Sequence, residues 1–499
     1  MRYENPVIQS DYSDPDVIRV GSDYFMVASS FNYIPGVPVL HSKNLVEWRL
    51  INYVIDKIPF DGYDKVLHGN GAWAPSLRCH MGRFYCLIPF PDEGIYVSTA
   101  DNPYGKWSPL RPLIRRKGLI DPCPIWTDGG AYVVCAFAKS RIGFNSKLAL
   151  FEADEQLCSA DENYTVIYDG ENLAPTVEGP KIYRQGKYFH ILAPCGGVKS
   201  GWQVDLRSEN IYGPYETKVV LMQGETDING PHQGALIDLD DSGQRWAFMH
   251  FQDKGAYGRV VHLQPAQWRG DWLICGESEG NIAGTPVSGG EYPVDIKTGY
   301  EIDPEDGFKE KLSPVWQNPA NPVQGWYEMK GGLKLYCVPH GGNLGSAPQL
   351  FLQKITYLNF SAKTKCRLNF SNDGDEAGFV MFGREYGYVC VVRRDGRNYF
   401  EIRKGSIDGK DETIARSQPY DDEYITFSVS AKFEERNKLT YKLSAGGNAF
   451  THKFYASGGV WTGARMGVYA RSESESGGFA TFKFFRVACT DNRVGNIKG

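Results

Sequence analysis

Apolar and polar residues alternate along most of this chain in short runs. Stretches such as Arg83–Leu87 and Tyr132–Ala136 are rich in aromatic or β-branched residues, and Gly, Asp, Asn or Pro bounds most of the runs. Alternation with a period of two between turn residues is typical of β-strands, and long helical patterns are hard to find. The pattern predicts an all-β protein.

This strand pattern repeats five times within the first 300 residues. In each repeat a proline opens a short strand, a turn follows, and a second, aromatic strand comes next. Each repeat has room for about four short strands, which is one blade of a propeller. The sequence predicts a five-bladed β-propeller over residues 1–300, with a β-sandwich containing coincidental Asp-Pro turns as the alternative. The aligned prolines are Pro15, Pro75, Pro122, Pro180 and Pro231.

A second domain is expected after the repeats. Residues 303–307 and 318–322 contain the Pro, Asp and Asn residues that are typical of linkers and turns. Alternating strands follow without the repeat, from Gly378–Phe382 to Thr481–Val487. A segment of this length suits a β-sandwich, so residues 310–499 are predicted to form a jelly-roll-like accessory domain.

Composition narrows the function. The chain of 499 residues has 54 Lys and Arg against 59 Asp and Glu, and this net charge of −5 argues against a nucleic-acid partner. No run of 18 apolar residues exists, so no membrane partner is expected. The 11 cysteines form no CxxC pair, which makes a zinc or redox site unexpected. Because no apolar signal core follows Met1, the protein is expected in the cytoplasm if Met1 is the native start, and otherwise in the periplasm or outside the cell with its signal removed.

The residues that flank the five prolines are expected around one cavity, because the innermost strand of each blade lines the axis of a propeller. They include Asp14, Asp121, Glu178 and His232. Carboxylates brought together repel, so one of them holds its proton near neutral pH, as a general acid beside a general base must. Taken singly, each residue is explained better as turn chemistry or as a hydrogen-bonded core residue. Their equivalent positions in successive repeats favour a site.

Short motifs spread over the first 290 residues carry a family resemblance. They resemble glycoside hydrolase family 43, and among its members the branch rich in α-L-arabinofuranosidases and β-xylosidases. Pro194–Gly197 stands where many members have a Glu before paired glycines, which agrees with this branch. The motifs are Ser13–Asp16, Phe31–Val37, His41–Trp48, Trp73–Pro75, Ile120–Pro122, Val177–Pro180, Gly196–Gln203, Asn229–Gly234 and Arg259–Pro265.

The resemblance implies roles for the carboxyl groups. Hydrolysis is expected to invert the configuration at the anomeric carbon, with Asp14 as the general base that activates a water molecule. Glu178 is implied as the general acid that protonates the departing oxygen, and Asp121 as the residue that orients this acid and tunes its pKa. Inversion needs about 6.5–9.5 Å between acid and base so that a water molecule fits.

Further positions are implied as ligand contacts. Arg259 matches an arginine that contacts the terminal sugar, with an ordinary hydrogen bond between blades as the alternative. No cofactor is required, but the family often holds a calcium ion near the axis with a histidine in its shell, and His232 is the matching position; calcium prefers oxygen ligands, so water would complete most of that shell. Phe31, Trp73 and Trp202 are candidates for stacking on the sugar, against the common alternative of packing between blades.

The leading interpretation is an exo-acting, inverting hydrolase that releases terminal α-L-arabinofuranose from plant polysaccharide fragments. β-D-Xylosidase activity, or both activities, is the near alternative, so the expected partners are arabinose- or xylose-containing oligosaccharides. A non-catalytic sugar-binding propeller and a retaining fructosidase are more distant alternatives. The C-terminal domain resembles the sandwich of many family 43 enzymes, and a pocket wall, a folding brace and an independent sugar-binding module all remain open for it.

Overall fold

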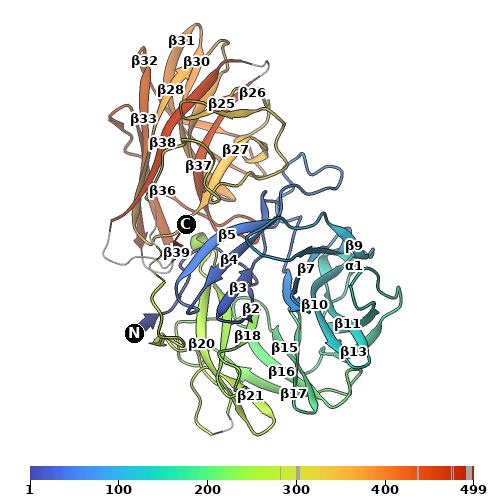
Figure 1. The fold of residues 1–499 in the computed structure, drawn as a ribbon. Helices are drawn as coiled ribbons and strands as arrows, with labels where there is room; N and C mark the ends of the chain where they lie inside the picture. Colours follow the sequence, from blue (N-terminus) through green and yellow to red (C-terminus); the bar gives the residue numbers. More distant parts are fainter. Residues whose placement is uncertain are drawn as a thin grey trace.

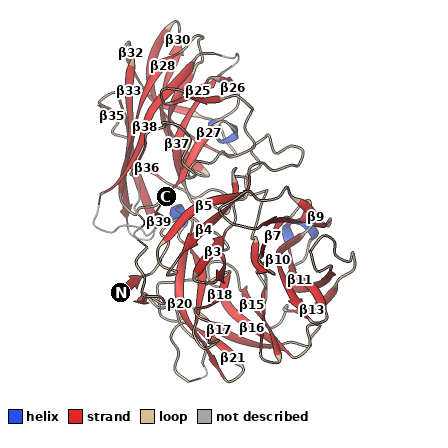
Figure 2. Ribbon diagram, viewed as in Figure 1, coloured by secondary structure: helices blue, strands red, loops and turns tan. Residues whose placement is uncertain are grey.

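The computed structural model describes the chain except for residues 281, 299, 301–303, 435–437, 474, 476, 491–496 and 499. Strands dominate this part of the chain (Figure 2), and its only helical segments are α1 (Lys139–Ile142), η1 (Gly255–Tyr257) and η2 (Leu344–Ser346). A five-bladed propeller is followed by a β-sandwich that lies against it (Figure 1). The predicted fold class is confirmed.

Each blade is a meander of four antiparallel strands in sequence order. The first strands of neighbouring blades contact one another around the axis, from β2 through β6 and β10 to β14, and β18 contacts β2. The blades are β2 (Asp16–Val20), β3 (Asp23–Val27), β4 (Gly36–Ser42) and β5 (Trp48–Ile55); β6 (Ser76–His80), β7 (Arg83–Phe90), β8 (Gly94–Ala100) and β9 (Arg111–Ile114); β10 (Leu119–Thr127), β11 (Gly130–Phe137), β12 (Lys147–Ala153) and β13 (Thr165–Asp169); β14 (Lys181–Gln185), β15 (Tyr188–Cys195), β16 (Trp202–Ser208) and β17 (Glu216–Leu221); and β18 (Gly234–Asp238), β19 (Trp246–Asp253), β20 (Arg259–Arg269) and β21 (Trp272–Cys275).

The N-terminal segment ties the first blade to the last. Strand β1 (Arg2–Glu4) pairs with β22 (Gly289–Glu291), and Ile8 forms a β-bridge with Val261 of blade five. The Asn5 side chain donates to the carbonyl of Leu263 at 2.8 Å. The ring is thus closed by chain that precedes the first repeat.

The repeated prolines follow a shared backbone turn. The residue before the proline has a positive φ in four blades: Asp14 (55°), Asp121 (54°), Gly179 (58°) and Gly230 (48°). This left-handed conformation favours glycine, and aspartate tolerates it better than most residues. Asp14 and Asp121 therefore occupy equivalent, strained positions beside the first strands of blades one and three, the kind of backbone often found at functional sites.

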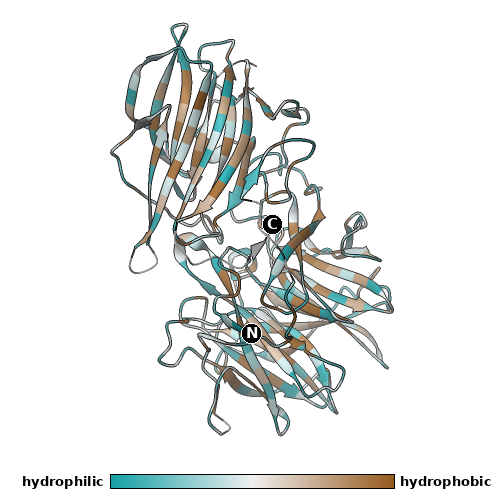
Figure 3. Cartoon of the chain, turned by 60° about the vertical axis from the view of Figure 1, so that its left-hand side comes forward, coloured by the Kyte–Doolittle hydropathy of each residue, from teal (hydrophilic) through white to brown (hydrophobic). Residues whose placement is uncertain are grey.

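Two sheets make up the sandwich, with an apolar core between them that includes the stacked rings of Phe379 and Phe485. Hydrophobic and hydrophilic residues alternate along many of its strands (Figure 3).

One sheet has the order β24 (Tyr327–Met329), β25 (Leu333–Tyr336), β38 (Phe479–Cys489), β28 (Phe360–Asn369), β33 (Tyr424–Glu434), β34 (Lys438–Ala445) and β35 (Asn448–Ala449), with β23 (Glu305–Asp306) and β36 (Phe454–Tyr455) beside it. The other has the order β26 (Val338–Pro339), β37 (Arg465–Ser472), β29 (Glu376–Phe382), β30 (Glu385–Arg394), β31 (Arg397–Ser406) and β32 (Glu412–Tyr420), with β27 (Leu350–Lys354) also on β37, while β39 (Ile497–Lys498) pairs with β5 of the propeller.

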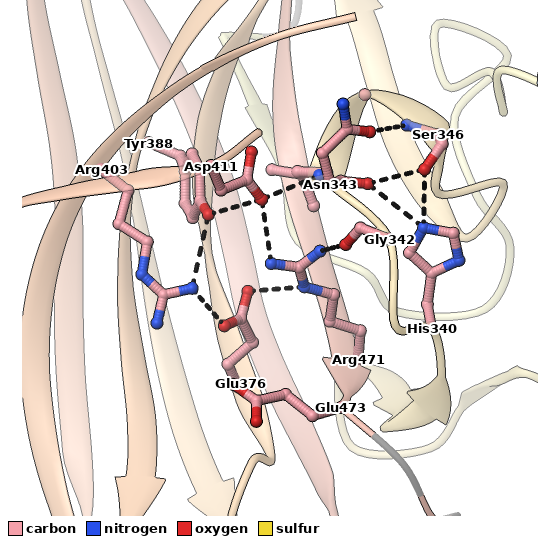
Figure 4. Close-up of polar contacts among 12 residues, drawn as sticks. His340, Gly342, Asn343, Ser346, Glu376, Tyr388, Arg403, Asp411, Arg471 and Glu473 are labelled. Carbon is pink, nitrogen blue, oxygen red and sulfur yellow. Dashed lines mark hydrogen bonds and ion pairs between the residues drawn. The ribbon is translucent and has the colours of Figure 1, made fainter. Parts of the chain in front are cut away.

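A buried network of charged and polar groups crosses the second sheet (Figure 4). The Glu376 carboxylate accepts hydrogen bonds from Arg471 at 2.7 Å and from Arg403 at 2.8 Å. Asp411 accepts from Arg471 at 3.2 Å and from the Tyr388 hydroxyl at 2.9 Å. Each of these charges has an opposite partner, as buried ions require. We interpret the network as part of the packing of the sandwich.

The segment between the domains joins the propeller to the sandwich. Asn318 forms a β-bridge with Ile34 of blade one, and Gln317 forms one with Leu352 of β27. The buried Arg465 guanidinium lies 3.6 Å from the centre of the Tyr33 ring and donates to Gln317 at 2.8 Å. The sandwich and the segment before it therefore contact the blade-one loop that contains Phe31. In the part of the chain that the structure describes, no helix is long and apolar enough to cross a membrane.

Candidate active site

The Asp14 carboxylate is buried at the start of blade one and is held from three sides. The hydroxyl groups of Ser13 and Ser29 donate to its Oδ2 at 2.7 and 2.5 Å. Arg259 donates from Nη1 to Asp14 Oδ1 at 3.2 Å and to the Ser13 hydroxyl at 2.7 Å. Two hydroxyl groups and one guanidinium group thus hold the carboxylate in one orientation, because hydrogen bonds to an ionised group are strong. The structure brings the predicted Arg259 and Asp14 into direct contact.

Asp121 and Glu178 are linked through one backbone group. The N–H of Gly179, the residue after Glu178, donates to Asp121 Oδ2 at 2.7 Å. Burial, together with the carboxylates of Asp121 and Asp14, raises the pKa of Glu178 to about 8. Burial also raises the pKa of Asp121, while the Gly179 N–H favours its ionised form. The Glu178 side chain is 35% exposed. A ligand can therefore reach this carboxyl group of raised pKa.

His232 lies beside Glu178, with Nε2 at 3.5 Å from Glu178 Oε1. Burial and the nearby Arg259 lower the pKa of His232 to about 3, which leaves a neutral imidazole. Neither ring nitrogen has a hydrogen-bond partner among the residues that the structure describes. Among the described residues, no three His, Cys, Asp or Glu side chains are grouped to hold a metal ion. These residues do not fit a protein cage for calcium, which prefers several oxygen ligands.

Two of the three predicted aromatic residues meet. The Phe31 and Trp73 rings lie edge to face, with centroids 6.2 Å apart. The Trp73 indole is fixed by a 2.9 Å hydrogen bond to the carbonyl of Gly69. Trp202 packs against the apolar core between blades three and four, which includes Cys195. Its ring lies directly against Gly196. This is the packing role that the sequence left open for Trp202, and its contact with a sugar stays a prediction.

A third aromatic residue reaches the same place from the sandwich. Trp461 lies between β36 and β37, is 51% exposed, and its ring centroid is 6.4 Å from that of Trp73. The Arg259 guanidinium lies 5.7 Å from the centre of the Trp461 ring. The sequence analysis missed this residue, although a bulky side chain after Gly458, Gly459 and Val460 is a visible signal of an exposed loop tip.

An open cavity of about 350 Å³ adjoins this contact. Arg259 and Trp461 line it together with Val198, Asp253 and Arg384, so both domains contribute to its walls. A cavity of this size accommodates a small ligand. Of the proposed site residues, Arg259 lines this cavity, and it links the cavity to Asp14 at 3.2 Å.

Known protein families match both parts of the chain. The description "Glycosyl hydrolases family 43" matches residues 3–273, which include all three carboxyl groups. The chain belongs to glycosyl hydrolase family 43. A second description, "Beta xylosidase C-terminal Concanavalin A-like domain", matches residues 305–488. The chain is an O-glycosyl hydrolase of the xylosidase and arabinofuranosidase type, rather than a non-catalytic sugar-binding propeller.

Similar proteins match nearly the whole chain. A putative β-xylosidase of Xylanibacter ruminicola is 37% identical over 478 residues, or 93% of this chain and 85% of that protein. A non-reducing end α-L-arabinofuranosidase of Bacteroides ovatus is 27% identical, over 98% of this chain and 95% of its own length. The crystal structure of a xylan β-1,4-xylosidase from Bacillus halodurans shares the fold, with a TM-score of 0.84 and 22% identity over 97% of this chain and 99% of that one.

Proposed function

We propose that the protein is an inverting, exo-acting pentosidase that removes a terminal β-D-xylose or α-L-arabinofuranose from plant oligosaccharides. The observation that carries this proposal is that the surroundings of the Asp14 and Glu178 carboxyl groups differ. Ser13, Ser29 and Arg259 clamp Asp14, whereas Glu178 is pushed toward its protonated form. Two carboxyl groups whose environments differ in this way suit a base and an acid.

The proposed reaction is a single displacement. A water molecule attacks the anomeric carbon and gives its proton to Asp14. The glycosidic C–O bond breaks, and Glu178 gives its proton to the departing oxygen. Asp121 holds the Gly179 N–H beside the acid and keeps the pKa of Glu178 high by repulsion. Arg259 also borders the cavity, where contact with the terminal sugar is part of the proposal.

Of the two sugars, β-D-xylose is the first candidate for the terminal residue of the substrate. The support is the name of the 37% identical relative, a putative β-xylosidase, and this reverses the order that the motifs alone suggested. The Bacteroides ovatus relative keeps α-L-arabinofuranose as the second candidate. The name of the Bacteroides ovatus relative, a non-reducing end α-L-arabinofuranosidase, supports exo action.

Initial rates on aryl β-D-xyloside and aryl α-L-arabinofuranoside, with Glu178→Ala in parallel, test the proposal. The wild type should hydrolyse at least one glycoside. Glu178→Ala should lose about 10²–10⁴-fold on xylo-oligosaccharides, the contribution of a general acid, and much less on aryl glycosides whose leaving group needs no proton. Asp14→Ala should lose both activities alike. Equal losses on both substrate types for Glu178→Ala would contradict the acid assignment.

The proposed proton transfers need no metal cofactor, because Asp14 and Glu178 supply base and acid. Treatment with EDTA should therefore leave the rates within about twofold of the untreated enzyme. A calcium ion beside His232, with a shell mainly of water, is a separate, structural proposal. A fall in the melting temperature after EDTA that added calcium restores would support this ion, and an unchanged melting temperature would contradict it.

A further inference from the structure

A turn of the propeller, residues 67–70, contacts both Trp73 and the sandwich. The turn is closed by a hydrogen bond from the Asn70 N–H to the Leu67 carbonyl at 3.0 Å. Its Gly69 carbonyl accepts a hydrogen bond from the indole N–H of Trp73 at 2.9 Å. The position of the turn therefore determines where the half-buried Trp73 indole lies.

His68 joins this turn to the sandwich. Its Nε2 lies 2.9 Å from the carbonyl oxygen of Gly345, which belongs to η2. Burial lowers the pKa of His68, so the imidazole is neutral near pH 7, and Nε2 must carry its hydrogen because a carbonyl oxygen only accepts. The ring also stacks on Phe382, with centroids 6.2 Å apart and 28° between the planes. A directional hydrogen bond and a ring contact thus hold this propeller side chain on the sandwich.

The sandwich holds Gly345 in place through its buried polar network. The Gly345 N–H donates to the Tyr386 hydroxyl at 2.9 Å, and this hydroxyl donates to Asp411 at 2.8 Å. Asp411 also accepts from the Leu344 N–H at 2.9 Å and from Arg471 at 3.2 Å (Figure 4). The carbonyl that receives His68 is therefore a fixed acceptor, because its backbone is hydrogen-bonded to groups that are themselves paired.

The turn approaches the sandwich at a second point. Gly69 has a φ of 79°, and a Cβ at this position would lie 2.5 Å from the Val460 side chain and 3.2 Å from the Trp461 ring. Glycine permits both this backbone conformation and this close approach. The rings of Trp73 and Trp461, with centroids 6.4 Å apart, therefore share the turn as a common support.

We propose that His68 is a positioning residue, which ties the turn to Gly345 of the sandwich and thereby places Trp73 for contact with the sugar. The inference rests on the proposed function, and it adds that Trp73 contacts the bound glycoside. Without the hydrogen bond from His68 the turn loses its link to η2, and the acceptor of the Trp73 indole is no longer fixed. The contacts of Asp14 and Glu178 do not involve this turn, so substrate binding should suffer more than turnover.

The test is the kinetics of His68→Leu on the aryl glycoside that the wild type hydrolyses faster. KM should rise about two- to fivefold, part of what a whole aromatic contact contributes, while kcat stays within about twofold. His68→Gln retains an N–H donor, so its KM should lie closer to that of the wild type. Tyr53→Phe is the matched control, since Tyr53 of β5 also donates to a carbonyl beyond the propeller, that of Pro314 at 2.7 Å, and β5 lies outside the turn.

Three outcomes of these kinetics would overturn the proposal. They are an unchanged KM in His68→Leu, an equal rise in Tyr53→Phe, and a KM of His68→Gln as high as that of His68→Leu. Tyr386→Phe decides if His68→Leu does not fold, because it retains His68 and removes the acceptor of the Gly345 N–H. Its KM should rise by a smaller amount, and an unchanged KM contradicts the proposal.

A double-mutant cycle shows whether His68 acts through Trp73. In a Trp73→Ala background, His68→Leu should no longer raise KM, because the contact that it positions is already absent. Residues that act through one another give such non-additive effects, whereas independent residues give additive ones. The same rise in KM in both backgrounds would show that His68 acts by another route.

The indole N–H resonance of Trp73 gives a readout that is independent of activity. Trp73→Phe identifies this resonance among those of the 11 tryptophans in protein labelled with ¹⁵N at the indole nitrogen. It should shift in His68→Leu and stay in place in Tyr53→Phe, because the hydrogen bond to Gly69 depends on the turn. If the wild type hydrolyses neither glycoside, the proposed function fails while this spectrum still tests His68. An unshifted Trp73 resonance in His68→Leu counts against the inference.

Discussion

Asp14 and Asp121 share a backbone conformation but differ in their partners. Both precede a proline, both have φ near 55°, and both are buried. Asp14 receives two hydroxyl groups and a guanidinium group, whereas Asp121 receives the backbone N–H beside Glu178. The repeat explains the common position, and the neighbours explain why one carboxylate suits a base and the other suits the control of an acid.

The pH dependence follows from the raised pKa of Glu178. A general acid must hold its proton, so kcat/KM should fall as the pH rises through about 8. Asp121→Asn removes a carboxylate that raises this pKa, so the basic limb should move to lower pH as the rate falls. The exposed Asp101 provides the control, and Asp101→Asn should leave the profile unchanged. A basic limb that does not move in Asp121→Asn would contradict the proposed coupling.

Single residues were predictable where the repeat marked them. The prolines pointed to Asp14, Asp121 and Glu178, because equivalent positions in consecutive blades converge on the axis. The hydrogen bonds of Asp14 with Ser29 and with Arg259 could not be predicted, since they join positions 15 and 245 residues apart without any period. The burial of Lys181 beside Asp16 was not predictable either, because a lysine at the start of a strand is ordinarily exposed.

At the scale of elements, two loops of the propeller bring Phe31 and Trp73 together. Phe31 forms a β-bridge with Ala72, the residue before Trp73, and Gly71 makes this close approach possible. A Cβ on Gly71 would lie 2.1 Å from the carbonyl oxygen of Phe31. This pair of loops determines the edge-to-face contact of Phe31 with Trp73.

Gly71→Ala should therefore displace the Phe31 loop. We expect a fall in kcat/KM together with a loss of stability above about 1 kcal/mol, because a backbone clash adds to the strain of a positive φ. Gly82→Ala is a matched control. Gly82 also has a positive φ, 77° against 89°, but in the described part of the chain no atom lies within 4 Å of an added Cβ. Similar effects of the two substitutions on kcat/KM and on the melting temperature would show that contact with Phe31 is unimportant.

Trp461 tests the contribution of the sandwich to the pocket. An aromatic contact of this kind is worth about 0.5–1.5 kcal/mol, so Trp461→Ala should lower kcat/KM about two- to twelvefold at an unchanged melting temperature. Tyr455→Ala removes another exposed aromatic side chain of the sandwich and serves as the control. Equal rates for Trp461→Ala and the wild type on xylo-oligosaccharides would exclude Trp461 from substrate binding.

At the scale of the whole molecule, the propeller and the sandwich share a polar interface. Asn321 exchanges two hydrogen bonds with the backbone of Ile58, and Lys354 of the sandwich donates to the carbonyl of Asp11 near the proposed base. Two separate domains could be predicted from the end of the repeat and the change in strand pattern. Their docking could not, because it depends on contacts between residues hundreds of positions apart that leave no periodic trace.

The interface should make the two domains unfold together. Calorimetry is expected to show one transition, and Arg465→Leu should destabilise it by about 1–3 kcal/mol, because Gln317 loses a buried donor. Arg367→Leu, which removes an exposed ion pair with Glu423, should have little effect. Two well-separated transitions in the wild type would show that the sandwich is not a brace.

The stereochemistry of the first product tests the central claim most directly. Proton NMR during the first minutes of hydrolysis of an aryl β-D-xyloside, or of the aryl α-L-arabinofuranoside if that is the better substrate, resolves the anomer formed before mutarotation mixes the two. Direct attack by a water molecule activated by Asp14, with Glu178 as acid, predicts the inverted anomer first, which is α-xylose from the β-xyloside. Initial formation of the retained anomer would mean a covalent intermediate and would contradict the account.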